Sequence, residues 1–216
     1  MPVDSPAYPV NLLLEGRRVL VVGGGAVAAS KVHGLLAARA IVHVVSLDVS
    51  AAVRELAVTW EQRPYERGEV TGYRLAVACT DDPAVNQAVF DDGEAAGVWV
   101  NAADDPERCS YTLPARADRG PLLVTVSTSG HSPALAAWLR DQLATRLGPE
   151  HDALLELLME ARAALVAEGR TRPAADWRQA LDSGMLDLIR TGQTIEAREL
   201  LYASLQLGEP PSMESR

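Results

Sequence analysis

Short apolar runs alternate with amphipathic stretches over roughly the first hundred residues of the chain. Each run is rich in valine and small apolar residues, which is typical of strands buried on both faces of a sheet. We therefore predict strands at 17–22, 41–46, 74–79 and 98–101, with a weaker strand near 58–61. Between them, apolar residues recur at helical spacing over 26–38 and 83–96. This alternation predicts a parallel sheet with right-handed crossovers.

The pattern changes in the second half of the chain. One more strand is predicted at 122–127, followed by a helix over 133–147 with Ser132 as its N-cap. Helical spacing then covers 153–168, 174–189 and 194–205, and we expect the tail from Gly208 to be disordered. The prediction is an α/β fold with a Rossmann-like parallel sheet. Its parts are a domain with this sheet at 1–113, a connecting segment at 114–148 and a small helical domain at 149–216.

Composition and charge exclude several classes of protein. The 216 residues are 48% hydrophobic, which is enough for one medium domain and a smaller appended one. The formal net charge of -9 argues against a nucleic-acid partner, which requires a basic surface. No apolar segment reaches the ~18 residues that cross a bilayer, and the first residues have no features of a secretory signal. Because the 2 cysteines form no disulfide framework, we expect a soluble cytoplasmic protein with no membrane partner.

The first predicted strand runs into a glycine-rich turn, Gly23-Gly24-Gly25-Ala26-Val27-Ala28, which has the pattern G-x-G-x-x-A. In a dinucleotide-binding turn, Gly23 permits the tight bend and Gly25 permits close approach of the pyrophosphate to the helix N-terminus. Asp48 follows 20 residues after Ala28, where a carboxylate accepts hydrogen bonds from the adenosine ribose. It also repels a 2′-phosphate, and neither of the next two residues is an arginine, so we predict NAD rather than NADP. The alternative is that Asp48 is a plain turn residue.

The triplet Asp-Asp-Pro occurs twice, each time just after a predicted strand. Both copies are expected at the carboxyl edge of the sheet, beside a bound dinucleotide, with Thr80 among the cofactor contacts. Asp82 precedes an uninterrupted helical pattern, so we interpret it as the N-cap of that helix. Asp104 and Asp105 precede no such pattern. One of them is therefore either a turn residue or a carboxylate that takes a proton as a neighbouring bond is oxidised.

Other motifs narrow the chemistry. The only lysine, Lys31, has no tyrosine four residues before it, which excludes the Tyr-x-x-x-Lys site of short-chain dehydrogenases. The cysteines and histidines have no zinc-ligand spacing, so no metal site is predicted. Ser127 and Thr128 precede a helix and are candidates to bind an anionic substrate edge, whereas we interpret His131 as a polar loop residue. Local positive charge comes from Arg108, Arg116 and Arg119.

Several stretches taken together resemble one known family. They are 8–14, 17–36, 78–89, 100–115 and 120–140, and they include "ACTDDPAVNQAV" and "VNAADDPERCSYTLPA". In order and spacing they are similar to the precorrin-2 dehydrogenases of sirohaem and cobalamin biosynthesis, including the dehydrogenase/ferrochelatase half of sirohaem synthase. The resemblance covers about residues 8–147, whereas residues 150–216 match only in being helical.

This resemblance implies NAD-dependent oxidation of precorrin-2, a tetrapyrrole rich in carboxylates, to sirohydrochlorin. The key aspartate of the family's Asn-x-x-Asp pattern falls on Asp104, as the general base. The implied and predicted cofactor contacts are Gly23, Gly25, Ala26, Val27, Leu47, Asp48 and Thr80. The predicted substrate contacts are Asn101, Ser127, Thr128, Arg116 and Arg119. Because family members are homodimers, the segment at 114–148 is assigned to dimerisation.

Three alternatives stay open at this point. Some family members also insert ferrous iron to give sirohaem, and because the tetrapyrrole supplies its own nitrogen ligands, the sequence does not decide whether Fe²⁺ is a substrate here. A regulatory module that senses NAD shares the glycine turn and the acid, but it does not need the loops at 101–104 and 127–132. A carrier that passes tetrapyrrole to another enzyme is the third possibility. Turnover of precorrin-2 with NAD separates a dehydrogenase from the module and the carrier.

Overall fold

The computed structural model describes residues 6–103, 105–171 and 173–210. The chain forms two compact units. The first consists of residues up to Pro114 together with Ser127–Pro133, and the second of Ala115–Val126 and Ala134 onward. The predicted disorder beyond Gly208 falls mainly on residues 211–216, which lie outside the described residues.

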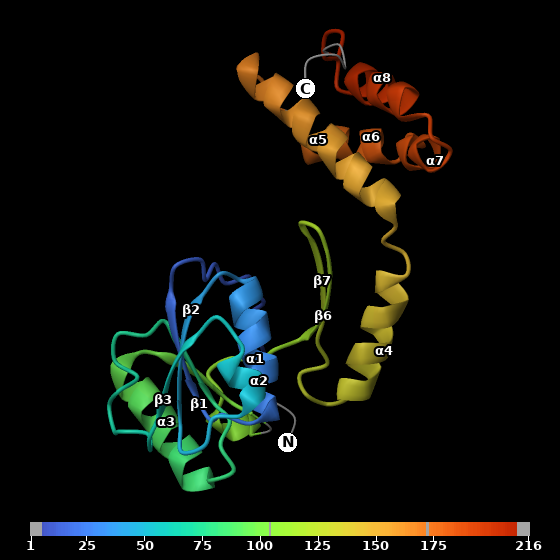
Figure 1. The fold of residues 1–216 in the computed structure, drawn as a ribbon. Coiled ribbons are helices and arrows are strands. Elements are labelled where there is room, and N and C mark those ends of the chain that lie inside the picture. Colours follow the sequence, from blue (N-terminus) through green and yellow to red (C-terminus); the bar gives the residue numbers. More distant parts are fainter. Residues whose placement is uncertain (1–5, 104, 172, 211–216) are drawn as a thin grey trace. The chain divides into compact units, whose positions relative to one another are not determined.

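Five parallel strands form the sheet of the first unit (Figure 1). In spatial order they are β3 (Thr59–Gln62), β2 (Ile41–Ser46), β1 (Arg18–Val22), β4 (Leu75–Ala78) and β5 (Trp99–Ala102). The chain moves outward from β1 to β3 and then crosses to β4, so the strand order reverses between β1 and β4. This is the Rossmann-like arrangement, in which ligands bind beyond the carboxyl ends of the strands at that switch point. The predicted parallel sheet is confirmed, with each strand within one residue of its expected bounds.

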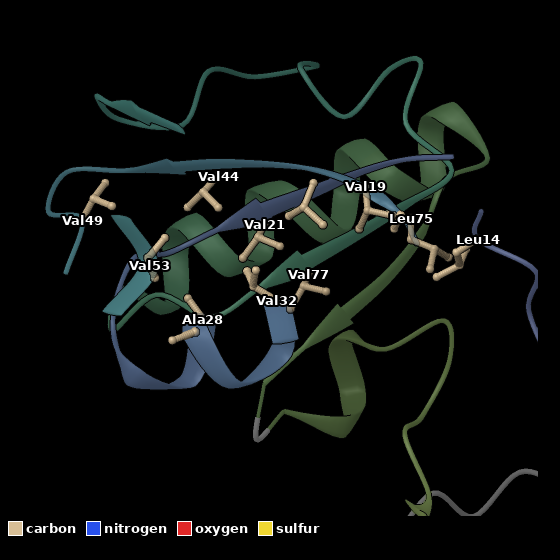
Figure 2. Close-up of a cluster of buried hydrophobic side chains, with 13 residues drawn as sticks. Leu14, Val19, Val21, Ala28, Val32, Val44, Val49, Val53, Leu75 and Val77 are labelled. Atoms are coloured by element: carbon tan, nitrogen blue, oxygen red, sulfur yellow. The ribbon is translucent and has the colours of Figure 1, made fainter. Parts of the chain in front are cut away.

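Helices cover both faces of this sheet. Valines that alternate along β1, β2 and β4, among them Val21, Val44 and Val77, pack under α1 (Ala26–Ala37) and α2 (Ala51–Arg54), as Figure 2 shows. The opposite face of the sheet packs against α3 (Pro83–Ala96) through residues such as Val89. Each fully buried valine stabilises the fold by about 1.5 kcal/mol or more. The core therefore fixes the strand ends from which the functional loops leave.

The start and end of α3 follow from its sequence. Asp82 is its N-cap, because the carboxylate accepts a hydrogen bond from the backbone N–H of Ala84 at 2.8 Å, and Pro83 occupies the first helical turn. Gly97 ends the helix with a φ of 66°, a left-handed conformation that glycine adopts without strain. The interpretation of the first Asp-Asp-Pro copy as a helix cap is confirmed.

A buried carboxylate ties α3 to the connection between β3 and β4. Asp92 accepts hydrogen bonds from the Tyr65 hydroxyl at 2.7 Å, from the Arg67 guanidinium at 2.8 Å and from the Gly68 N–H at 2.7 Å. Burial alone raises the pKa of the Asp92 carboxyl, but these three donors and the charge of Arg67 bring it below its usual value. The ionised form of Asp92 is therefore favoured in the folded protein.

The second unit contains a hairpin and five helices among its described residues (Figure 1). Strands β6 (Ala115–Arg119) and β7 (Leu122–Val126) pair antiparallel, so the strand predicted at 122–127 belongs to this hairpin and does not extend the parallel sheet. The helices are α4 (Pro133–Ala144), α5 (Pro149–Ala167), α6 (Ala174–Leu181), α7 (Met185–Arg190) and α8 (Thr194–Ser204).

The single helix predicted at 174–189 is wrong. Gly184 has a φ of 93°, which no right-handed helix accommodates, and the chain breaks there into α6 and α7. The break allows Met185 and Ile189 of α7 to pack with Leu157 of α5 in one core. Helical periodicity alone did not reveal it, because both halves keep apolar residues at helical spacing.

We predict that Asp92→Ala destabilises the protein by about 1–3 kcal/mol, because the buried donors of Tyr65 and Gly68 lose their acceptor. Since the pKa of Asp92 is lowered by folding, its contribution is fully present above the unfolded value of about 4 and is lost as the pH falls through the folded value. Urea denaturation of wild type and variant at several pH values measures this. Asp91→Ala, at an exposed position of the same helix, is the control and should stay within about 0.5 kcal/mol of wild type. A difference that persists unchanged below pH ~3 would contradict the assignment.

Candidate functional site

The glycine turn after β1 is packed on one side and open on the other. A side-chain carbon added to Gly23, whose φ is +125°, would lie 2.4 Å from the carbonyl oxygen of Cys79 at the end of β4. One added to Gly24 would lie 2.1 Å from the carbonyl oxygen of Asp48, after β2. At Gly25 no atom lies within 4 Å of such a carbon. The first two glycines are therefore required for packing, whereas Gly25 borders open space in which a ligand can approach the backbone.

This open space lies at the N-terminus of α1. Gly25 is the N-cap and has no side chain with which to cap the helix. The first helical hydrogen bond runs from the Ala29 N–H to the Gly25 carbonyl at 3.0 Å, so the N–H groups of Ala26 and Val27 precede any helical acceptor. Both residues are exposed, Val27 by 45%. Unpaired N–H groups and the positive end of the helix dipole make this a site that fits a pyrophosphate.

The loop after β2 is fixed beside the glycine turn. The Ser50 N–H donates to the Gly24 carbonyl at 2.9 Å, and the Ser46 hydroxyl donates to the Asp48 carbonyl at 2.7 Å. These bonds hold the backbone while the side chains of Leu47 and Asp48 stay exposed. Contact of these two residues with the adenosine part of a dinucleotide stays a prediction.

Sequence reasoning missed an arginine in this region. The Arg54 guanidinium donates to the Val49 carbonyl at 2.9 Å and to the Gln62 side chain at 3.1 Å, and it lies 5.1 Å from the Trp60 ring centroid. Only the two residues after Asp48 were considered for a cation, whereas a helical turn brings Arg54 back to the loop. The acceptors of these two hydrogen bonds, a carbonyl and an amide oxygen, are neutral, so neither bond pairs the guanidinium with a carboxylate.

The loop after β4 depends on a buried asparagine that the sequence did not single out. Asn86 of α3 accepts from the Thr80 N–H at 3.2 Å and from the Thr80 hydroxyl at 2.8 Å, and its amide donates to the Thr80 carbonyl at 2.9 Å. Asn86 is only 9% exposed. Thr80 is therefore held at the carboxyl edge of the sheet, next to the packed end of β4. In the sequence, the available signal for this contact was the position of Asn86, a polar residue on the otherwise apolar face of the helix predicted at 83–96.

The second Asp-Asp-Pro copy follows β5. Asp104 lies outside the described residues. Asp105 forms an ion pair with Arg108 in the short 3-10 turn Pro106–Arg108, and the Arg108 Nε donates to the Gln87 side chain at 2.5 Å. The predicted absence of a helix after this copy is confirmed apart from that single turn. Asp105 thus has a cationic partner within its own loop.

Asn101 is buried, with 7% of its surface exposed. Its amide donates to the Tyr111 carbonyl at 2.9 Å and lies 3.3 Å from the Cys109 sulfur. Direct binding of substrate by Asn101 stays a prediction, and its amide donors have partners within the protein.

The loop before α4 is closed by its own hydroxyl groups. The Thr128 hydroxyl accepts from the Ser132 N–H at 3.0 Å and donates to the Ser132 carbonyl at 3.1 Å, while the Ser127 oxygen accepts from the Ser129 N–H at 3.2 Å. Ser129 has a φ of 51°, which is unusual outside glycine and asparagine. The His131 ring nitrogen Nδ1 lies 3.0 Å from the Thr128 carbonyl, in agreement with a local loop role.

The two predicted substrate-binding arginines of β6 have acidic neighbours. Arg116 lies 3.4 Å from Asp118, and Arg119 lies 3.0 Å from Asp152 of α5. Both arginines belong to the second unit. Arg119 is about one-third exposed and Arg116 half exposed, so solvent weakens these pairs.

The described residues contain no group of three or more histidine, cysteine, aspartate or glutamate side chains that is arranged to hold a metal ion. None of the helices in the same residues is long and apolar enough to cross a membrane.

Comparisons with known proteins follow this division of the chain. Residues 10–115 match a family model described as "Putative NAD(P)-binding", and residues 119–146 match one described as "Sirohaem biosynthesis protein central". The siroheme synthase of Azotobacter vinelandii is 38% identical over 207 residues, which covers 93% of this chain and 44% of that protein. The siroheme synthase of Gluconacetobacter diazotrophicus is 36% identical over 215 residues, with coverages of 92% and 44%.

A solved structure extends the comparison to the fold. The structure of "SirC, precorrin-2 dehydrogenase" matches with a TM-score of 0.66 and 25% identity, and the match covers 93% of this chain and 100% of that one. The chain spans less than half the length of the siroheme synthases it matches. The chain therefore belongs to the family that the precorrin-2 dehydrogenase SirC shares with one segment of the siroheme synthases.

Proposed function

We propose that this protein oxidises precorrin-2 to sirohydrochlorin with NAD as the electron acceptor. The observation that carries the proposal is the glycine turn, in which Gly23 and Gly24 are packed while Gly25 leaves open space at an uncapped helix N-terminus. That arrangement fits a dinucleotide pyrophosphate. Membership of the family adds the substrate class, a tetrapyrrole.

The residues that would hold the cofactor follow from this geometry. Gly23 and Gly25 shape the turn, and the backbone N–H groups of Ala26 and Val27 bind the pyrophosphate. Leu47 and Asp48 contact the adenosine, where the exposed carboxylate of Asp48 disfavours a 2′-phosphate. Thr80 borders the nicotinamide half of the dinucleotide. The chemistry that NAD supplies when bound is acceptance of a hydride.

Asp104 is proposed as the general base that takes the proton released when the macrocycle is oxidised. Its neighbour Asp105 is paired with Arg108, which supports assigning the role of proton acceptor to position 104. The carboxylates of precorrin-2 require cations and N–H or O–H donors. Ser127, Thr128, Arg116 and Arg119 are the proposed substrate contacts, with Asn101 acting at the base of the Asp104 loop. Both arginines would have to exchange an acidic partner for the substrate.

The protein is further proposed to act as a homodimer that pairs through the segment 114–148. A hollow of about 300 Å³ is lined by Val126, Trp138, Leu139, Gln142, Leu143 and Arg146. Among the lining residues Trp138 is 57% exposed, and Leu135 on the same helix is 46% exposed. A second copy of the same segment is the occupant that this apolar surface fits, because a self-complementary patch pairs about a twofold axis.

Iron insertion and the two non-enzymatic readings remain separate hypotheses. No observation in the described residues favours Fe²⁺ as a second substrate, and anaerobic incubation of the protein with sirohydrochlorin and Fe²⁺ decides it. A sensing module or a tetrapyrrole carrier would bind NAD or tetrapyrrole without forming NADH. Spectroscopic turnover of precorrin-2 with NAD distinguishes both from the dehydrogenase.

The two adjacent glycines provide a matched test of cofactor binding. Gly25→Ala should weaken NAD binding at least about tenfold while leaving the melting temperature near that of wild type, because the added carbon fills only open space. Gly24→Ala should instead destabilise the fold, since its carbon meets the Asp48 carbonyl. Isothermal titration and thermal unfolding measure the two effects, and wild type should bind NADP more weakly than NAD. Unchanged NAD affinity in Gly25→Ala would remove the basis of the site.

The role of Asp104 is tested by Asp104→Asn. We expect turnover of precorrin-2 to fall about 100-fold or more while NAD affinity stays within about twofold, because only the proton acceptor is lost. Single-turnover measurement of NADH absorbance reports the first effect and titration the second. The control is Asp82→Asn in the other copy of the triplet, which keeps an N-cap oxygen and should keep activity. Full activity of Asp104→Asn would refute the assignment.

Dimerisation is tested by Trp138→Glu. A charge in the apolar hollow should shift the protein from dimer to monomer, which sedimentation velocity detects at micromolar concentration. Ile195→Glu, at an exposed position on α8, is the control and should leave the mass unchanged. A wild-type protein that sediments as a monomer would contradict the proposal.

A further inference from the structure

After β5 the chain leaves the sheet and then returns along the edge of the same strand. The Ser110 N–H donates to the Val100 carbonyl at 2.7 Å, and Asn101 forms an antiparallel bridge with Cys109. The edge of β5 is therefore paired, and the chain that leaves the sheet at Ala102 returns to it at Cys109, beside Asn101. Asp104 belongs to this loop by its position in the sequence.

Two side chains join the ends of the loop. The Asn101 amide donates to the Tyr111 carbonyl at 2.9 Å and lies 3.3 Å from the Cys109 sulfur. The Cys109 thiol lies 3.3 Å from the Ala102 carbonyl and 3.2 Å from the Asp105 carbonyl. We call this pair, Asn101 and Cys109, the loop clip. Burial raises the pKa of the Cys109 thiol, so the sulfur keeps the proton that it donates.

The residues on either side of Asp104 are held by this arrangement. The Ala103 N–H donates to the Ala78 carbonyl of β4 at 2.8 Å. On the other side, the Asp105 carbonyl accepts a hydrogen bond from the Cys109 thiol, and the Asp105 carboxylate forms an ion pair with Arg108. The chain is therefore anchored immediately before and immediately after position 104. A reacting group must be held to within about 1 Å, because a larger misplacement costs about 100-fold in rate.

We propose that Asn101 and Cys109 are positioning residues, which fix the Asp104 loop for proton transfer and do not themselves contact the substrate. This proposal rests on the proposed dehydrogenase function. It reassigns Asn101 from a substrate contact to a residue that acts through the loop backbone. It also gives a function to a thiol whose burial makes it a poor nucleophile.

The experiment combines kinetics with hydrogen exchange on three variants of the full chain. In Asn101→Asp and Cys109→Ala, we expect the rate of NADH formation to fall about 10- to 100-fold while the Kd for NAD stays within about twofold. Cys109→Ser should recover much of the rate lost in Cys109→Ala, because its single O–H can still donate to one of the two carbonyls. Amide exchange in peptides from 102–110 should increase in the first two variants.

A matched control separates the clip from an unrelated change of charge. Asn11→Asp changes an exposed asparagine and should retain the wild-type rate and exchange. Normal turnover in Asn101→Asp and Cys109→Ala would contradict the positioning role of the clip, and so would a loss of NAD affinity as large as the loss of rate. Neither result would contradict the proposed dehydrogenase function. A wild type that forms no NADH from precorrin-2 contradicts the proposed function, and unchanged exchange in the variants then also rejects the clip as a structural device.

Discussion

The contact on which the candidate site depends is the close packing of Gly23 and Gly24 against two neighbouring loops. The space beside Gly23 is filled by the Cys79 carbonyl after β4, and that beside Gly24 by the Asp48 carbonyl after β2. Both contacts are backbone to backbone, so no side chain can be added without moving a strand end. They bring the loops after β1, β2 and β4 together at one edge of the sheet. The N-terminus of α1 begins at the same edge, where Gly25 borders open space.

The parallel sheet could be predicted because burial on both faces leaves an unmistakable pattern in the sequence. β4 contains only apolar residues and β1 does so after Arg18, while the helices between the strands keep their spacing. β6 could not be predicted in the same way, because its sequence Ala-Arg-Ala-Asp-Arg alternates half-buried and exposed positions and includes three charges. Its pairing partner β7 supplies the hydrophobic residues. A hairpin of this kind is defined by pairing and not by the composition of either strand.

The sequence predicted the part of the candidate site that depends on backbone conformation. It did not predict the part that depends on hydrogen bonds between side chains and distant residues. The glycine pattern indicated the turn, since the requirement for a missing side chain is local. The hydrogen bonds of Asn86 to Thr80, of Arg54 to Val49 and of Asn101 to Tyr111 join residues from different elements. Only the fold brings these groups within bonding distance.

The two copies of Asp-Asp-Pro show how the same short motif can serve different purposes. In each copy the second aspartate has a structural partner, the Ala84 N–H for Asp82 and the Arg108 guanidinium for Asp105. The first copy begins a helix of 14 residues, whereas the second begins a single 3-10 turn and returns to the sheet edge. A turn that short contributes little helix stability. The second copy therefore lacks the capping role that explains the first, and the carboxylate of Asp105 is paired with a guanidinium instead of with a helix N–H group.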